Sequence, residues 1–359
     1  MLENTLYKLN NGNEFTVGYF GGSITEGAGS SEYSKCWAGL FTEWLKSEYK
    51  NCKINEIRAA IGGTGSSFGL YRCDEQLLAY KPDLVFFEFA TNDSGWGYEE
   101  CSKNAEGIFR KILNSNPYAD IIVVYTLTNA MAASIENGNV LESRAAQSHI
   151  AYYYGDILQI EIGEALRKKV YENGGDWLKF TKEGVHPNDD GYAIYFETIK
   201  KKVTEAFNKA DKINQPVIRE LPPAIYSREL EMAHMEDIWN FTLNEKWKRI
   251  DKSLCGRYPH YIEATEPGAT LELKFTGTRC ELFWMMAKDS GDIIYTCDGG
   301  EEMTRSSWDS YCLNFNRANA HWLARNLPYG EHILKLRISE NKNEKSEGTA
   351  IRIAALLVQ

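Results

Sequence analysis

Short apolar runs alternate with segments of helical period from residue 15 to about residue 207. In the first such segment, apolar residues recur at i, i+3, i+4, i+7 and i+8, so they form one face that we expect to lie in a core. This face consists of Trp37, Leu40, Phe41, Trp44 and Leu45. The apolar runs predict strands over residues 15–20, 54–61, 83–90 and 120–127, with a weaker candidate over residues 156–160. Strands that alternate with helices are typical of a parallel sheet covered by helices, so this part of the chain is predicted to be α/β.

The pattern changes after about residue 207. Residues 211–223 contain three of the nine prolines and show little periodicity, which is typical of a linker or a connecting arm. Beyond them, apolar and polar residues alternate as in half-buried strands. The alternating apolar positions include Leu271, Leu273 and Phe275, then Cys280, Leu282, Trp284 and Met286, then Leu334, Leu336 and Ile338. Together with the hairpin-turn signal Asp298-Gly299-Gly300, this alternation predicts an antiparallel β-sandwich.

The length of the chain agrees with two domains, because 359 residues exceed the roughly 100–200 of a usual domain. We therefore predict an α/β domain over residues 1–210, a linker over residues 211–223 and a β-sandwich domain over residues 224–359.

Composition and charge narrow the classes of partner. Hydrophobic residues make up 43% and charged residues 25%, as in ordinary globular proteins. The net charge of −10, without a block of basic residues, argues against nucleic acid or an anionic membrane surface and favours a neutral substrate. Residues 1–4 lack the features of a secretory signal, and the eight cysteines show no CxxC pair and no zinc-site spacing. We expect a cytoplasmic protein with free thiols and with neither metal nor cofactor.

Four polar loops stand where ligands bind in parallel α/β sheets, at the carboxyl ends of strands. Ser23 follows the first predicted strand, Gly62-Gly63-Thr64-Gly65 follows the second, and Thr91-Asn92-Asp93 follows the third. A fourth segment, residues 183–188, precedes a predicted helix whose N-cap is Asn188 or Asp189. We expect the four loops to meet at one edge of the sheet.

The residue types in these loops suit ester hydrolysis. Ser23 can attack a carbonyl and His186 can accept its proton. Glu183 can hold the other imidazole nitrogen in the correct tautomer. The backbone N–H of Ser23, a backbone N–H of the glycine loop and the Asn92 amide can stabilise the oxyanion.

These loops resemble the four sequence blocks of the SGNH (GDSL-like) hydrolases. The matching segments are Gly21–Thr25, Ile61–Gly63, Thr91–Asp93 and Glu183–Pro187, in the order and spacing of that family. The resemblance covers about residues 15–207. It implies a flavodoxin-like three-layer sheet and ester hydrolysis without a metal. Within the second block it favours Gly63 over Gly62 as the oxyanion glycine.

Two positions depart from the family pattern. The family usually has Asp where Gly22 and Glu183 stand. The first change leaves the geometry of the nucleophile loop open, and the second leaves open whether the site is a triad or a Ser–His dyad.

The C-terminal region resembles the β-sandwich that some SGNH-type carbohydrate acetyl esterases carry. Turn segments at residues 298–300, 327–332 and 346–349 support this resemblance, which implies an O-acetylated oligosaccharide as substrate. We assign Gly22, Trp96 and Trp308 to substrate binding. The two tryptophans suit walls for a sugar ring, and each has a packing role as its alternative.

Alternatives remain for the nucleophile and for the function. Gly65-Ser66-Ser67-Phe68-Gly69 matches the G-x-S-x-G elbow. Ser67 ranks second because choosing it leaves Ser23 and Asn92 without roles. The alternative functions are a short-chain lipase or thioesterase, and a non-catalytic carbohydrate-binding protein with an esterase fold. The oligomeric state is not predicted.

Overall fold

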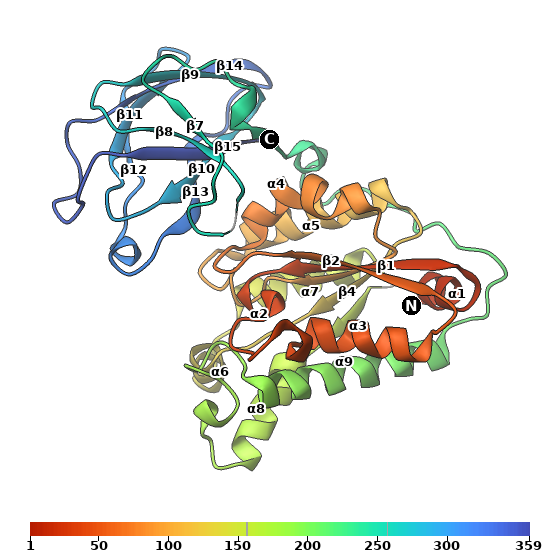
Figure 1. Ribbon diagram of the computed structural model, residues 1–359. Coiled ribbons are helices and arrows are strands. Elements are labelled where there is room, and N and C mark those ends of the chain that lie inside the picture. Colours follow the sequence, from red (N-terminus) through yellow and green to blue (C-terminus); the bar gives the residue numbers. More distant parts are fainter. Residues whose placement is uncertain (156, 257) are drawn as a thin grey trace. The chain divides into compact units, whose positions relative to one another are not determined.

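The computed structural model describes residues 1–155, 157–256 and 258–359 (Figure 1). The chain divides into two compact units, Met1–Glu231 and Met232–Gln359. Each unit has its own hydrophobic core. No helix formed by the described residues is both long and apolar enough to cross a membrane.

The first unit is built on five parallel strands in the order β2-β1-β3-β4-β5. The strands are β1 (Glu14–Gly21), β2 (Lys53–Ala60), β3 (Leu84–Glu88), β4 (Asp120–Val124) and β5 (Leu158–Ile160). Strands β3 and β4 are buried along their whole length, as expected for central strands covered on both faces. All five predicted strands are present. Asp156, at the start of the fifth prediction, lies outside the described residues.

Helices lie on both faces of this sheet, with α3 and α9 on one side and α4 and α5 on the other (Figure 1). The helices are α1 (Glu3–Asn11), α2 (Ser23–Glu26), α3 (Trp37–Glu48), α4 (Ser66–Gln76), α5 (Tyr98–Ser115), α6 (Asn129–Glu136), α7 (Glu142–Tyr153), α8 (Ile162–Glu172) and α9 (Asp189–Lys209). On α3 the predicted apolar face packs into the core, where Trp37, Phe41 and Leu45 are fully buried. The flavodoxin-like three-layer sheet predicted from the sequence is confirmed.

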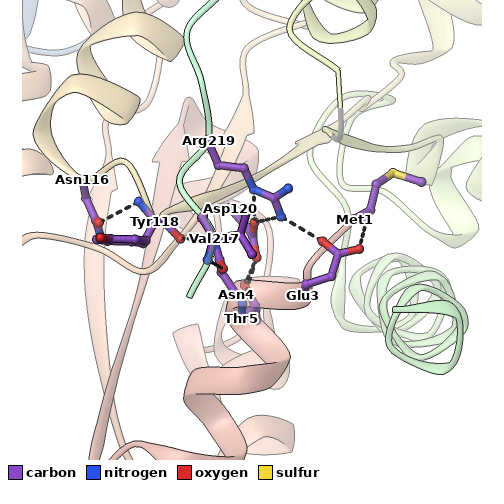
Figure 2. A network of polar contacts seen from close by, with 9 residues as sticks. All are labelled: Met1, Glu3, Asn4, Thr5, Asn116, Tyr118, Asp120, Val217 and Arg219. Atoms are coloured by element: carbon purple, nitrogen blue, oxygen red, sulfur yellow. Dashed lines mark hydrogen bonds and ion pairs between the residues drawn. The ribbon is translucent and has the colours of Figure 1, made fainter. Parts of the chain in front are cut away.

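The predicted linker, residues 211–223, lies against the first unit. Figure 2 shows how polar contacts fix it. Asn4 of α1 donates to the carbonyl of Val217 and accepts from its N–H, both at 2.7 Å. Arg219 donates to Asp120 at 2.7 Å and to Glu3 at 2.9 Å. The segment is therefore a docked arm and not a free spacer.

Helix α5 holds the next part of the same arm. The buried carboxylate of Glu106 accepts from the backbone N–H groups of Ile225 and Tyr226 at 2.7 and 2.9 Å. Arg110 donates to the carbonyl of Pro222 at 2.8 Å and pairs with Glu231. These contacts place residues 224–231 in the first unit, so the second unit begins at Met232 and not at residue 224.

The second unit consists of two antiparallel sheets whose inner faces form one core. One sheet has the order β13-β10-β15-β8-β7, with β6 paired to β15, and the other has the order β12-β11-β14-β9. The strands are β6 (His234–Asp237), β7 (Lys248–Ile250), β8 (Tyr261–Ala264), β9 (Thr270–Gly277), β10 (Cys280–Met286), β11 (Asp292–Cys297), β12 (Met303–Ser306), β13 (Arg317–Ala324), β14 (Gly330–Ile338) and β15 (Ile351–Val358). The predicted alternation is present in β9, whose residues are buried at every second position. The predicted antiparallel sandwich is confirmed.

The structure also shows the state of the cysteines and the conformation of the predicted hairpin turn. No disulfide joins cysteines of the described residues. Strands β11 and β12 pair antiparallel across the predicted turn, where Asp298 and Gly299 have φ of 52° and 71°. Both residues adopt the left-handed conformation that a tight hairpin turn requires.

Candidate active site

The nucleophile candidate lies on a sharp turn between strand and helix. Strand β1 ends at Gly21, Gly22 is the N-cap of α2, and Ser23 is the first residue of that helix. The Ser23 Oγ lies 2.8 Å from Nε2 of His186, although 163 positions separate the two residues in the chain. The turn therefore presents the serine directly to the imidazole.

The loop that carries His186 is held by its own backbone. The N–H of Lys182 donates to the carbonyl of His186 at 2.9 Å, and Thr181 forms an isolated bridge with Pro187. Helix α9 begins immediately afterwards, because the Asn188 side chain accepts from the N–H of Gly191 at 3.0 Å. Asn188 is thus the N-cap, one of the two residues predicted.

Helix α9 also ties this loop to the nucleophile helix. The Tyr192 hydroxyl lies 3.0 Å from the carbonyl oxygen of Ile24 and 2.7 Å from that of Ala28. Gly29 passes so close that an added Cβ would lie 2.4 Å from the carbonyl of Pro187 and 3.0 Å from the Cβ of His186. These contacts explain how residues so far apart in the chain keep a fixed separation.

Glu183 faces the other nitrogen of the imidazole. Its carboxylate contacts Nδ1 of His186 and accepts from the backbone N–H of His186 at 3.3 Å. A carboxylate only accepts, so these partners assign the proton to Nδ1 and leave Nε2 free to accept from Ser23. The Glu183 side chain is 50% exposed and that of His186 is 29% exposed. Water therefore competes for this carboxylate, in contrast to the buried acid of the serine-protease triad.

Two of the predicted oxyanion donors, Gly63 and Asn92, lie in loops that contact the turn and helix of the nucleophile. The N–H of Gly62 donates to the Glu26 carboxylate of α2 at 3.1 Å, whereas the N–H of Gly63 has no partner among the described residues. The Asn92 side chain lies against Gly22, where an added Cβ would fall 1.9 Å from its Oδ1. Glycine at position 22, where the family resemblance expects Asp, thus leaves room for Asn92.

Asp93 fixes the loop that carries Asn92. It is buried and accepts from the N–H of Ser66 at 2.8 Å and from the Gln147 amide at 2.9 Å. Burial raises the pKa of Asp93 to about 6, although these donors act to lower it. Because Ser66 is the first residue of α4, Asp93 joins the Asn92 loop to the glycine loop that precedes this helix.

Comparison with known proteins identifies the family of this unit. Residues 19–194 match the GDSL-like Lipase/Acylhydrolase family. The first unit is a GDSL-like hydrolase domain. No curated protein matches the chain. The resemblance inferred from the four loops is confirmed by this match.

Among solved structures, the chain is similar to a two-domain esterase (CEX) active on acetylated mannans. The two share 19% identity with a TM-score of 0.82, over 100% of this chain and 95% of that chain. A structure of such an esterase co-crystallised with mannopentaose matches with 18% identity and a TM-score of 0.80, over 99% and 94% of the two chains. At this identity the likeness shows the fold, and both domains of this chain take part in it.

The GDSL-like domain contains buried charges near the nucleophile that the sequence analysis did not single out. Glu88 ends β3 and Arg72 lies on α4, and both are 0% exposed. One signal for Glu88 is visible in the sequence, because this acid interrupts the otherwise apolar run of residues 84–90. Arg72 has a weaker signal as a basic residue next to Leu70 and Tyr71. Neither position belongs to the four blocks of the resemblance.

The two tryptophans predicted to bind substrate and the rival serine lie in different environments. Trp96 follows Asn92 on the same loop and is 45% exposed, so its ring is accessible to a ligand. Trp308 is 8% exposed and packs in the core of the second unit, which is the alternative role expected for it, so we do not retain it as a substrate-binding residue. Ser67 is half-buried on α4 and has no histidine partner among the described residues, so the geometry favours Ser23 over the rival elbow.

Outside the GDSL-like domain, Cys297, Asp298 and His332 offer ligand atoms within 4.8 Å of one another. Nδ1 of His332 lies 2.7 Å from Oδ2 of Asp298, and Nε2 of His332 lies 2.8 Å from the carbonyl oxygen of Pro328. Both partners are acceptors, so both imidazole nitrogens donate. A metal ligand instead needs a lone pair on a neutral imidazole. Burial opposes the charge, but the bonds to Asp298 and Pro328 raise the pKa of His332. The cluster therefore stabilises the β11–β12 turn as a hydrogen-bonded unit.

Proposed function

We propose that this protein is a serine esterase that removes acetyl groups from O-acetylated oligosaccharides through an acyl-enzyme at Ser23. The observation that carries the proposal is the hydrogen bond between Ser23 and His186, with Glu183 on the far side of the ring, inside a GDSL-like domain. This arrangement supplies a nucleophile, a base and an orienting acid in one contiguous set.

The mechanism follows from these contacts. Ser23 Oγ attacks the acetyl carbonyl carbon while His186 Nε2 takes the hydroxyl proton. The tetrahedral oxyanion accepts from the N–H groups of Ser23 and Gly63 and from the Asn92 amide. His186 then returns the proton to the departing sugar oxygen, and the C–O bond to the sugar breaks. A water molecule then gives a proton to His186 and attacks the acetyl-serine; the bond between the acetyl carbon and Ser23 Oγ breaks, His186 returns the proton to Ser23, and acetate is released.

An acetylated sugar is favoured as substrate by three observations. The net charge of −10 and the lack of a basic patch in the sequence suit a neutral ligand. The exposed ring of Trp96, on the Asn92 loop, offers a stacking surface for a sugar ring. The two-domain fold is shared with an esterase active on acetylated mannans.

The catalytic proposal is tested by hydrolysis of p-nitrophenyl acetate. We expect Ser23→Ala to abolish turnover while the circular dichroism spectrum and melting temperature stay unchanged. Ser67→Ala is the matched control, since it removes a hydroxyl from the rival elbow, and it should keep full activity. Activity retained in Ser23→Ala would overturn the assignment, and loss confined to Ser67→Ala would move the nucleophile to the elbow.

The substrate proposal needs a separate measurement. Acetate release should be followed on acetylated xylo-, manno- and chito-oligosaccharides, with p-nitrophenyl butyrate and octanoate as the acyl-length series. A sugar deacetylase should lose rate steeply beyond acetyl. A rate that rises with acyl length, without acetate release from any sugar, would favour a short-chain lipase, whereas sugar binding without any hydrolysis would favour a binding protein.

A further inference from the structure

The turn before Ser23 consists of two glycines that the surrounding atoms require. An added Cβ at Gly21 would lie 2.5 Å from the Thr25 hydroxyl and 2.6 Å from the carbonyl of Glu88. At Gly22 it would meet the Asn92 side chain. Two successive glycines have more backbone freedom than any other pair. The orientation of Ser23 must therefore be fixed by contacts from outside the turn.

Arg72 provides one such contact. Its guanidinium donates to the carbonyl of Gly21 at 3.0 Å and to the carbonyl of Ala59 at 2.6 Å, so it joins the carboxyl ends of β1 and β2. The guanidinium also lies 4.5 Å from the ring centre of Phe20. Only a planar fork of donors reaches two carbonyls in this way, and lysine has no such fork.

Glu88 provides the opposite contact. Its carboxylate accepts from the Thr25 hydroxyl at 2.8 Å and from the Thr126 hydroxyl at 2.7 Å, and it faces the N–H of Gly22, which acts to lower its pKa. The Thr126 hydroxyl lies 2.7 Å from that of Thr91, the residue before Asn92. Glu88 thus contacts the nucleophile turn directly and the Asn92 loop through one further hydroxyl.

The two contacts meet on a single peptide unit, because the carbonyl of Gly21 and the N–H of Gly22 belong to the same peptide bond. We propose that Arg72 and Glu88 are positioning residues that hold this peptide from its two ends and so fix the Oγ and N–H of Ser23 for the reaction. The guanidinium at the carbonyl oxygen and the carboxyl oxygens of Glu88 facing the N–H match the direction of the peptide dipole. This inference rests on the proposed esterase function of Ser23.

Burying the charged side chains of Arg72 and Glu88 costs free energy, and this cost indicates that they have a functional role. The hydrogen-bond partners of the Arg72 guanidinium are neutral, namely the carbonyls of Ala59 and Gly21 and the Gln76 amide, and burial lowers the pKa of the guanidinium to about 9. Burial likewise raises the pKa of Glu88 to about 7, although the hydroxyls of Thr126 and Thr25 and the N–H of Gly22 act to lower it. Apolar residues at such positions usually stabilise a fold as well or better. Charges that are costly to bury and that converge on the turn of the nucleophile point to a role in catalysis.

The test compares steady-state hydrolysis of p-nitrophenyl acetate by Arg72→Met, Arg72→Lys and Glu88→Gln with the parent enzyme. A small displacement of a reacting group costs up to about 100-fold in rate, so we expect kcat to fall roughly 10- to 100-fold with KM within about twofold. The rate of Ser23 labelling by a fluorophosphonate should fall in parallel, because it reports the reactivity of the serine without the substrate. Arg72→Lys carries the test for this position if Arg72→Met does not fold.

Matched controls exist on α5. Glu106 is a buried carboxylate that accepts from two backbone N–H groups and from the Tyr154 hydroxyl. Arg110 is a buried arginine that donates to a backbone carbonyl. Both resemble Glu88 and Arg72 in kind, but they hold the docked arm and not the turn of the nucleophile. Glu106→Gln and Arg110→Met should lower the melting temperature and leave kcat unchanged. Equal loss of kcat in these controls, or full kcat in the Arg72 and Glu88 variants, would overturn the proposal. An inactive parent enzyme, or a fully active Ser23→Ala variant, would instead show that the proposed function itself is wrong.

Discussion

Gly22 offers a sharp test of how the nucleophile turn and the oxyanion donors depend on each other. Its φ of −96° and ψ of −152° are extended and lie outside the left-handed region that favours glycine. The added Cβ would nevertheless lie 1.9 Å from Oδ1 and 2.7 Å from Cγ of Asn92. The flexible side chain is the group that yields, so Asn92 must rotate away from the turn.

The expected loss follows from the donor that is displaced. Removing one oxyanion donor typically lowers kcat by about 10²–10³, or roughly 2.7–4 kcal/mol of transition-state stabilisation. Replacing glycine at a compatible position also restricts the unfolded chain and stabilises a fold by about 0.4–1 kcal/mol. Gly22→Ala should therefore lower kcat on p-nitrophenyl acetate by about 100-fold while the melting temperature stays the same or rises.

A double-mutant cycle separates this explanation from a general disturbance of the turn. In an Asn92→Ala background the obstructing side chain is gone, so the further change Gly22→Ala should cost less than about threefold, or roughly 0.7 kcal/mol. Full activity in Gly22→Ala would refute the steric argument. Losses that multiply in the double variant would show that the glycine acts through something other than Asn92.

Four further outcomes are expected. Glu183→Gln should lower kcat at least about tenfold, and a change below about threefold would define a Ser–His dyad. Arg219→Met leaves the buried Asp120 carboxylate without its cation, so urea unfolding should show a loss of about 3 kcal/mol at unchanged kcat. The pKa of Glu88 is raised from 4.5 to about 7, so its protonated form contributes stability below pH 4.5 that is lost as the pH rises through 7. In urea unfolding between pH 4.5 and 8, the parent should lose on the order of 3 kcal/mol relative to Glu88→Gln. A difference between the two proteins that does not change with pH would contradict this prediction. Trp96→Ala should raise KM for an acetylated oligosaccharide but not for p-nitrophenyl acetate, and equal effects on both would exclude sugar stacking.

The sheet of the first unit and the sandwich of the second could be predicted because local patterns encode which face is buried. Strand β9 has buried residues at every second position, and α3 buries Trp37, Phe41 and Leu45 at helical spacing. The period of the pattern decides between strand and helix, and it needs no information about distant residues. The ends of β3 were predicted less well, because residues 89 and 90 stay buried and apolar after the strand has ended.

The contacts that dock the arm could not be predicted in the same way. They join residues far apart in the chain, such as Asn4 with Val217 and Asp120 with Arg219. Single polar residues of this kind carry no periodic signal, and a stretch rich in proline has the same composition whether it is docked or free. The position of the domain boundary was therefore predicted too early, at residue 224 instead of Met232.

In the site, too, residues in local motifs could be predicted, whereas residues that act through distant contacts could not. Ser23, His186 and Glu183 could be singled out because each stands in a loop whose residue types resemble a known block, and the structure brings the three together. Arg72 and Glu88 lie outside these loops, and their importance depends on which backbone atoms they reach. Contacts between a side chain and a distant carbonyl or N–H leave no pattern in the sequence beyond an isolated charge among apolar neighbours.

The exposure of Glu183 determines where the catalytic power of such a site must come from. A carboxylate that is half in water interacts weakly with its partner, since solvent screens the charge. Its contribution to orienting His186 is then smaller than that of a buried acid. Stabilisation of the transition state must come mainly from donors that are already aligned before substrate arrives. In the proposed mechanism the N–H of Ser23 and the amide of Asn92 are such donors, and Glu88 contacts Thr25 of the nucleophile helix and, through Thr126, the Thr91 hydroxyl of the Asn92 loop. If the proposed mechanism holds, the buried contacts of the GDSL-like domain, rather than the solvent-exposed acid, determine the geometry of the reaction.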